Sequence, residues 1–527
     1  MQSTAADVLR ASDASEFAYP TPPELHVTAW NTLLQTATAT SPQMPFTVDG
    51  PSQPESLRDV GSQYHSSSNR IVLPRDDFYR RACWSPDGSL LLAVTESQQT
   101  HTFAYRHHLD SFKGDEGRIL EFRTRRKSPS PLLDAIWYPL PAMEEPTDDL
   151  TQPATPPMPS WCYAESHRDL PIRLTGSQDG RSRASYSIMN HVEKFVGPHS
   201  LAFSPDLSRI YCGLHSALAV FPLSKPGLNT HASIPLVEGK RSTGGQRGII
   251  SALAATAHPS DPTQELIAVG TFNATVAVYS FDPTEFPEPA EHTAVPTAGS
   301  DGHGSLARKS CLAGWREVEG DGITQLKFHP LSPYVLFVAS RRSYHIYVYD
   351  IRYLMGDTSK WSFRPLAQPA AGVRTAHLLA KLRRPGGASH QRLYFDVDWA
   401  GRWLASGDEQ GMISLWRIDV DRFTNQTNGD HDQIDGPHEA ELRPDMTWKA
   451  HQDAIGSVTF HPHEPWLVSV SGSRRWPDTQ REGCSDSKPT DSGSDVEDAS
   501  SPRRAWTTSD SSLKLWDLSQ PPTLPAL

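Results

Sequence analysis

Residues 455–473 read IGSVTFHPHEPWLVSVSGS, and residues 511–518 read SSLKLWDL. Apolar residues alternate in the first run up to an aromatic residue, a His-Pro turn follows, and a second apolar run ends in small residues. The last segment alternates again and ends near Trp-Asp. Alternation with a period of two, bounded by Pro, Gly, Asp and Ser, predicts three consecutive strands joined by tight turns.

The same pattern of three strands and two turns occurs seven times between residues 80 and 518. An insertion splits the second copy, and the copies begin at Arg80, Leu132, His199, Gly248, Gly322, Arg392 and Ile455. Blades of WD-repeat propellers have four strands and about 40–45 residues each, so seven blades need about 300 residues. We therefore predict an all-β chain folded as a seven-bladed WD40-type β-propeller, in which the surplus residues form insertions.

The surplus residues are rich in Pro, Ser, Thr and acidic side chains, a composition typical of disordered segments and loop insertions. We expect a mostly disordered N-terminal region over 1–68, a propeller over 69–518 and a C-terminal tail over 519–527. The predicted acidic and Pro-rich insertions lie near 139–160, 283–312, 424–446 and 473–508. Closing a propeller needs an outer strand from one end of the chain, and we predict it at Asn69–Leu73. Local order, as a brief helix or a docking segment, is expected for Ala29–Gln35.

The seventh copy contains the polar residues that link strands inside WD repeats. His451 precedes its first strand, Asp510 lies in its second turn and Trp516 in its third strand. With a hydroxyl from Ser469 or Ser471, these side chains predict a buried chain of hydrogen bonds that fixes the strands. A Ser–His–Asp hydrolase is the alternative, but no GxSxG motif surrounds these serines.

Other copies depart from this chemistry. The sixth has Gln410 where the turn Asp is expected, although Trp416 remains, and the fourth has Tyr279 in place of Trp. Apolar packing must therefore hold these blades more than the polar chain does. The histidines of the His-Pro pairs, His258, His329 and His461, occupy the position of Ser-Pro in other copies, so we expect them in turns.

Composition narrows the possible functions. The chain has 49 Lys+Arg and 61 Asp+Glu, a formal net charge of -12, which argues against a generally cationic protein that coats nucleic acid. Five scattered cysteines without a CxxC pair indicate a reducing compartment with neither disulfides nor a zinc site. No secretory signal, membrane span, phosphate-binding loop or HExxH motif is present. We therefore expect no enzyme activity, no cofactor, no metal, no small-molecule substrate and no membrane partner.

Several strings are more particular than the WD consensus. NHVEK (190–194) precedes the third copy, QRGIIS (246–251) opens the fourth and QRLYFDVD (391–398) opens the sixth. In this order, across about 80–476, they resemble the telomerase Cajal body protein family, which includes a fungal branch associated with splicing. The resemblance implies a nuclear WD-repeat protein that binds small nuclear RNA (Cajal body, spliceosomal or telomerase) or snRNP proteins. It also implies roles in snRNP function, RNA localisation or pre-mRNA splicing, and a location in the nucleus, including nuclear bodies, with the cytoplasm as a further possibility.

Basic and aromatic residues at strand ends inside these strings are the candidate RNA contacts, since unpaired RNA is bound by stacking and by cations on phosphates. The candidates are Arg247, Arg341, Arg342, Arg392, Arg474, Arg475, Tyr344 and Trp476. The alternative is structural, because arginines at strand ends often brace neighbouring blades through carboxylates, and Arg392 lies near Asp396 and Asp398 in sequence.

Two further alternatives remain open. RTRRKSPSP (123–131) is either a nuclear localisation element tuned by phosphorylation or the solvated edge of a hairpin. The whole chain is either an RNA-binding propeller or a protein-interaction scaffold without direct RNA contact, which the acidic net charge favours. A contiguous basic rim would support RNA binding, and an apolar patch would support protein binding.

Overall fold

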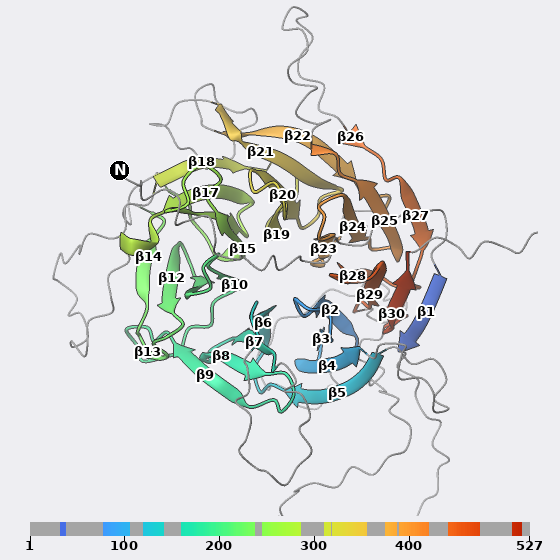
Figure 1. Cartoon of the computed structure of the whole chain (residues 1–527), viewed down its shortest axis with the longest axis horizontal. Helices are drawn as coiled ribbons and strands as arrows, with labels where there is room; N and C mark the ends of the chain where they lie inside the picture. Colours follow the sequence, from blue (N-terminus) through green and yellow to red (C-terminus); the bar gives the residue numbers. More distant parts are fainter. Residues whose placement is uncertain are drawn as a thin grey trace, which may run out of the picture.

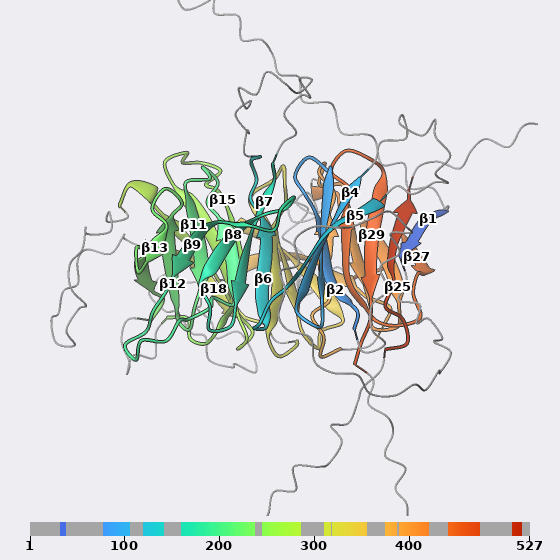
Figure 2. The same cartoon turned by 90° about the horizontal axis from the view of Figure 1, so that it is seen from below.

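The chain folds into seven β-sheets arranged as blades around a central axis (Figure 1), and from the side the blades form a disk (Figure 2). The computed structural model describes residues 32–37, 77–105, 120–141, 160–237, 245–285, 310–317, 319–355, 375–386, 389–420, 441–474 and 508–518. The prediction of an all-β, seven-bladed WD40-type propeller is confirmed. Within the described part of the chain, no helix is long and apolar enough to cross a membrane.

Each blade is an antiparallel sheet whose first strand lies nearest the axis (Figure 1). Blade 1 comprises β2 (Tyr79–Trp84), β3 (Leu90–Thr95), β4 (Gln99–Tyr105) and β5 (Leu120–Lys127). Blade 2 comprises β6 (Leu132–Trp137), β7 (Cys162–His167), β8 (Ile172–Gly176) and β9 (Ser182–Ser187). Blade 3 comprises β10 (Ser200–Phe203), β11 (Arg209–Gly213), β12 (Ala217–Pro222) and β14 (Ala232–Pro235).

The remaining four blades follow the same order. Blade 4 comprises β15 (Ile250–Ala257), β16 (Glu265–Thr271), β17 (Thr275–Phe281) and β18 (Ser310–Arg316), with a 3-10 turn, η2 (Pro283–Glu285), after β17. Blade 5 comprises β19 (Ile323–Phe328), β20 (Val335–Ser340), β21 (His345–Met355) and β22 (Thr375–Arg383). Blade 6 comprises β23 (Phe395–Val397), β24 (Trp403–Gly407), β25 (Met412–Arg417) and β27 (Met446–Lys449). Blade 7 comprises β28 (Ile455–Phe460), β29 (Trp466–Ser471), β30 (Leu513–Asp517) and β1 (Thr32–Ala37).

Two short strands extend blades at their outer edge in parallel register. β13 (Gly227–Leu228) pairs with β9, and β26 (Glu441–Leu442) pairs with β22. Each lies between the third and fourth strands of its own blade and pairs with the outer strand of the preceding blade.

The closing strand differs from the prediction. β1 pairs antiparallel with β30 and completes blade 7 at its outer edge, so the N-terminal side of the chain closes the ring (Figure 1). The strand predicted for this role, Asn69–Leu73, lies outside the described residues. The segment Ala29–Gln35, for which we expected a brief helix or a docking segment, instead overlaps this closing strand. An isolated seven-residue helix is unstable in water, whereas the open edge of β30 offers hydrogen-bond partners to an extended segment, so a strand forms here in place of a helix.

The core is built between blades rather than within them. One apolar cluster joins blade 1 to blade 7 through Tyr79, Trp84 and Val468, and another joins blade 5 to blade 6 through Phe337 and Trp416. Both faces of the middle strands are therefore covered, which explains why β3, β16, β17 and β20 are buried at every position. Such strands read as continuous apolar runs, not as alternating ones.

Small residues end the second run of several copies because the next blade approaches closely there. A Cβ atom added to Gly270 would lie 2.5 Å from Ile323, and one added to Gly407 would lie 2.4 Å from Ile455. Each isoleucine opens the inner strand of the following blade. A larger side chain at either glycine would therefore push neighbouring blades apart.

The His-Pro turns follow the predicted placement and, in two cases, link blades. His461 Nδ1 accepts hydrogen bonds from two turn amides, and its Nε2 lies 3.1 Å from the Gly88 carbonyl oxygen of blade 1. His329 makes the equivalent contacts, with Nε2 2.9 Å from the Gly401 carbonyl oxygen of blade 6. His258 accepts two turn amides at Nδ1 in the same way.

The predicted insertions fall largely on residues outside the described ranges, as do most of 1–68 and all of 519–527. RTRRK lies in β5, the outer strand of blade 1. Arg126 contacts the carboxylate of Glu165 in blade 2 and donates to the Thr175 hydroxyl at 2.8 Å. This basic run therefore includes a bond between two blades.

Candidate nucleic-acid interface

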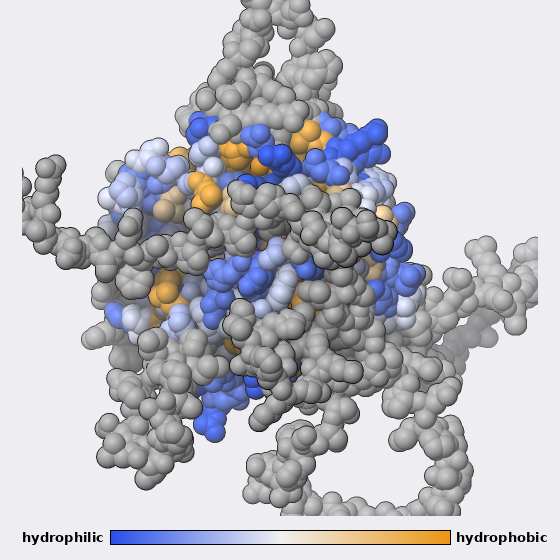
Figure 3. All heavy atoms as spheres, turned by 45° about the vertical axis from the view of Figure 1, so that its right-hand side comes forward, coloured by the Kyte–Doolittle hydropathy of each residue, from blue (hydrophilic) through white to orange (hydrophobic). Residues whose placement is uncertain are grey.

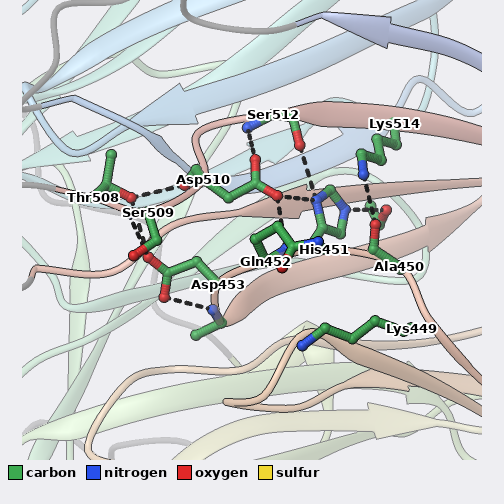
Figure 4. Close-up of polar contacts among 12 residues, drawn as sticks. Lys449, Ala450, His451, Gln452, Asp453, Thr508, Ser509, Asp510, Ser512 and Lys514 are labelled. Atoms are coloured by element: carbon green, nitrogen blue, oxygen red, sulfur yellow. Dashed lines mark hydrogen bonds and ion pairs between the residues drawn. The ribbon is translucent and has the colours of Figure 1, made fainter.

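The polar residues predicted to form a buried chain in blade 7 are joined by hydrogen bonds, and Figure 4 shows His451 and Asp510 side by side. His451 Nε2 is 2.7 Å from Ser469 Oγ, and Trp516 Nε1 donates to the same oxygen at 2.8 Å. Asp510 lies 3.3 Å from His451 Nδ1 and accepts the amide of Gln452. The hydroxyl comes from Ser469, while the buried Ser471 Oγ has no hydrogen-bond partner. Burial lowers the pKa of His451, whereas hydrogen bonds, including the one with His451, hold the pKa of Asp510 well below its usual range despite burial.

Other blades build the same connection from different residues. In blade 5, Glu317 accepts hydrogen bonds from Trp315 Nε1 at 3.0 Å and from the Tyr349 hydroxyl at 2.8 Å. In blade 4, Gln246 holds Tyr279 and two backbone carbonyl groups. The side chain that enters from the connection between blades therefore varies, but its function of fixing a third-strand aromatic is retained.

Blade 6 places Arg384 at this position. Its Nε donates to Ser406 Oγ at 3.0 Å, and burial lowers its pKa to about 10. Asp408, two residues before the expected Gln410, accepts the turn amides of Gln410 and Met412. Asp408 thus supplies the turn carboxylate that the sequence pattern placed at Gln410.

The described candidate RNA contacts lie on a single face of the propeller. Arg341, Arg342, Tyr344 and Arg474 belong to turns between the second and third strands of blades 5 and 7. Arg247 and Arg392 belong to connections that lead into the inner strands of blades 4 and 6. Arg475 and Trp476 lie outside the described residues. Antiparallel order puts both kinds of segment at the same end of every blade, so the candidates face one side.

Three of these arginines line one cavity. A hollow of about 850 Å³ at the channel mouth is lined by Arg341, Arg392 and Arg474, together with Arg80, Phe272 and Tyr394 among others. An adjoining cavity of about 280 Å³ shares Arg80, Arg392, Tyr394 and Arg474 and adds Arg81 and Arg168. Cavities of this size are typical of small-ligand sites.

Most arginines around the mouth are paired with carboxylates. Arg341 Nε lies 2.7 Å from Asp321, and Arg342 lies 3.8 Å from the same carboxylate. Arg80 and Arg474 both contact Glu96. These arginines therefore form the ion pairs with carboxylates that the structural alternative predicted.

Arg392 differs from them. No carboxylate lies within ion-pair distance of its guanidinium among the described residues, because Asp396 instead binds Lys327 and Asp398 caps its own turn. Its guanidinium carbon is 5.1 Å from the centre of the Phe272 ring, and Nη1 is 3.5 Å from the Tyr394 hydroxyl. The bracing proposed for Arg392 from its sequence neighbours is therefore wrong.

Tyr394 and Phe272 complete a ladder of alternating cations and rings. Arg81 stacks over Tyr394 at 4.7 Å, and Arg341 lies 5.8 Å from the Phe272 ring centre. Although burial opposes it, the pKa of Tyr394 is lowered by the charges of Arg392 and Arg81. Sequence reasoning missed Phe272, Tyr394, Arg81 and Arg168. For Arg392 the alignment of the repeats carries a further signal. Six residues before the first turn, other copies have Tyr79, Leu132, Ile323 and Ile455, whereas the sixth copy has Arg392. A charged residue thus takes the place of an apolar or aromatic one.

Tyr344 is the aromatic candidate that the structure describes. It is 43% exposed, and its backbone amide donates a hydrogen bond to the Glu319 carboxylate at 2.7 Å. Arg247 contributes its carbonyl oxygen to Asn273 Nδ2 at 3.2 Å. Both residues lie outside the residues that line the mouth cavities, so the structure brings only part of the candidate set into one site.

The opposite face carries exposed apolar side chains. Leu331 and Trp399, in the first turns of blades 5 and 6, are 65% and 59% exposed. Trp399 lines a separate cavity of about 500 Å³ at the other end of the channel. In the view of Figure 3 the described surface is mainly hydrophilic, with hydrophobic residues in small separate groups. Among the described residues, no group of three His, Cys, Asp or Glu side chains has a geometry suited to a metal ion.

The fold and these blade contacts define a WD-repeat β-propeller. A family model, "WD domain, G-beta repeat", matches residues 442–475. The predicted resemblance to telomerase Cajal body proteins is confirmed: the chain is 28% identical to telomerase Cajal body protein 1 of Rattus norvegicus over 80% of its length and 64% of the rat protein. It is 26% identical to the Homo sapiens protein of that name, over 81% of this chain and 61% of the human one.

A fungal relative is also similar. The guanine nucleotide-binding protein negative regulator 1 of Schizosaccharomyces pombe is 26% identical over 65% of this chain and 71% of its own length. The chain spans less than two thirds of the length of the rat and human relatives. The comparisons therefore support a WD-repeat propeller similar to proteins that are named for the Cajal body and telomerase.

Proposed function

We propose that this chain is a nuclear WD-repeat protein that binds small nuclear RNA or the proteins of its RNPs. Its similarity to telomerase Cajal body protein 1 over about four fifths of the chain carries the proposal. The arginine-lined mouth supports it, because cations next to aromatic rings are the surface that unpaired RNA requires. Roles in RNA localisation, snRNP function or pre-mRNA splicing, and residence in nuclear bodies, are parts of the same proposal.

Crosslinking and immunoprecipitation of the tagged protein from cells, followed by sequencing of the bound RNA, tests this function. Enrichment of Cajal body, spliceosomal or telomerase RNA over a mock pull-down is the expected result and names the ligand. Imaging of the tagged protein should place it in the nucleus. Recovery of proteins without any enriched RNA would overturn direct RNA binding.

A protein-interaction scaffold without direct RNA contact is the second candidate. The exposed Trp399 and Leu331 on the face opposite the arginine-lined mouth favour it, because isolated aromatic side chains beside a cavity are frequent anchors of protein interfaces. Replacing Trp399 with Ala should then remove specific proteins from the immunoprecipitate while the RNA profile stays unchanged.

A further inference from the structure

The mouth cavities contain two arginines without a carboxylate partner. Arg392 is half-buried and Arg168 is exposed, and both line the cavity of about 280 Å³. Among the described residues, neither guanidinium has a carboxylate within ion-pair distance. Although burial opposes it, Tyr394 and the charge of Asp134 raise the pKa of Arg392, so Arg392 stays charged. Both guanidinium groups therefore keep N–H donors that no carboxylate occupies among the described residues.

Three carboxylates line the two cavities. Asp134 and Glu96 are already engaged, and Glu409 lines only the larger cavity. Asp134, the closest acid on the inner strands, binds Arg81 at 2.6 Å and accepts the amide of Leu201 at 2.8 Å. Glu96 binds Arg80 and Arg474. The cavity therefore retains an excess of positive charge at Arg392 and Arg168.

The charges of Arg392 and Arg168 also act on His199. It lies at the start of blade 3, and its ring is 6.4 Å from that of Phe272. Burial first, and then the charges of Arg392 and Arg168, lower the pKa of His199. The charges of two guanidinium groups from different blades thus reach the same imidazole ring.

We propose that Arg392 and Arg168 bind a backbone phosphate of single-stranded RNA inside the mouth cavity, next to the ring of Phe272. This inference rests on the proposed function and adds its contact site. An arginine presents several N–H donors in one plane and matches phosphate oxygens in pairs. The half-buried Phe272 ring, already flanked by Arg392 and Arg341, supplies an apolar face for a neighbouring base.

Single-stranded RNA is favoured over duplex RNA and over protein by the shape and chemistry of the site. The cations lie inside a cavity, where a flexible single strand enters and the rigid backbones of a duplex do not. A phosphodiester carries one charge on each nucleotide beside a flat base, which fits a cation placed beside a ring.

The test measures binding of a fluorescein-labelled uridine decamer to the full chain by fluorescence anisotropy at several salt concentrations. We expect R392Q and R168Q each to weaken binding at least about tenfold, the loss of a charge-assisted hydrogen bond. Each should also lower the slope of log affinity against log salt by about 0.7, the value for one phosphate on a single strand. R392K should retain most of this slope, because it keeps the charge.

The matched control is R342Q, which removes a 53% exposed arginine on the same face but outside both cavities and should change affinity less than about twofold. Circular dichroism checks the fold of each variant, and the exposed Arg168 keeps the test decisive if R392Q does not fold. Wild-type binding that is unaffected by R392Q and R168Q overturns the site but leaves the proposed function intact. No binding of RNA by the wild-type chain overturns both, and R392-dependent binding of a glutamate decamer in its place assigns the cavity to acidic peptides.

Discussion

One neutral histidine contributes to the seam between blades 7 and 1, beside the apolar cluster and the Arg474–Glu96 ion pair. His461 Nδ1 accepts the amides of His463 and Glu464 at 3.1 and 2.9 Å, so this nitrogen carries no proton. Nε2 therefore carries the proton and donates it to Gly88 across the seam. The ring also packs edge-on against Trp84 with centroids 4.6 Å apart. Replacement of His461 by Ala thus removes an interblade hydrogen bond and an aromatic contact together.

The expected cost follows from these contacts. Removing a buried aromatic side chain costs about 3 kcal/mol, and a lost hydrogen bond adds about 1 kcal/mol. Burial lowers the pKa of His461 from 6.5 to about 4. Its contribution to stability is therefore complete above pH 6.5 and is lost as the pH falls towards 4, up to about 3 kcal/mol.

Urea unfolding monitored by circular dichroism between pH 7.5 and 4.5 measures both effects. H258A is the matched control, because His258 accepts two turn amides in the same way but, within the described ranges, its Nε2 makes no hydrogen bond to another blade. We expect H461A to lose about 3–4 kcal/mol at pH 7.5, H258A less than about 1 kcal/mol, and the fall in stability below pH 6.5 to be shallower in H461A than in the wild type. Equal losses in the two variants, or an unchanged pH dependence in H461A, would refute the role of the seam.

Three further outcomes follow from the same contacts. S469A should lower the free energy of unfolding in urea by about 2–4 kcal/mol, because it leaves His451 Nε2 and Trp516 Nε1 buried without this hydrogen-bond partner. S471A removes a hydroxyl that has no partner and should cost less than about 1 kcal/mol. Similar losses in the two variants would contradict the buried chain of hydrogen bonds. Burial raises the pKa of Glu317 from 4.5 to about 7, so its stabilising effect is complete below pH 4.5 and is lost as the pH rises through 7. E317Q should therefore gain stability relative to the wild type as the pH rises from 5 to 8. A difference in unfolding free energy between the two proteins that stays constant with pH would count against this. Deletion of residues 32–37 exposes the edge of β30. It should lower the melting temperature in calorimetry and promote self-association in light scattering. A monomer with an unchanged melting temperature would show that β1 does not close the ring.

The fold was predictable because each copy carries its own signals. Alternation, Pro or Gly turns and aromatic ends recur seven times, and repetition makes the period visible even where one copy is irregular. The closing strand was not predictable in this way, because β1 is a single short apolar segment without a repeat, and its partner β30 is almost five hundred residues away. The pairing depends on an edge that exists only after the other blades have formed.

The site was predictable only in part, for a related reason. The candidate arginines share a face because strand order fixes which turns lie at the same end of the propeller. Arg341 pairs with Asp321, 20 residues away in the connection into the same blade, and Arg474 pairs with Glu96, 378 residues away in blade 1. Neither partner could therefore be read from neighbouring sequence positions. Phe272 and Tyr394 look like ordinary apolar residues of strand ends until the ring brings them beside Arg392.

The acidic net charge and an RNA-binding mouth are compatible once distance is considered. At physiological salt, charges are screened over about 8 Å, so a phosphate inside the cavity is influenced mainly by the guanidinium groups that line it. Of the three carboxylates that line the cavities, Glu96 and Asp134 are paired with Arg80, Arg81 and Arg474, and Glu409 lines only the larger cavity. Because the net charge of -12 acts only at longer range, it slows the approach of RNA more than it weakens the bound state. The local pairing of charges, and not their sum, therefore decides what this propeller binds.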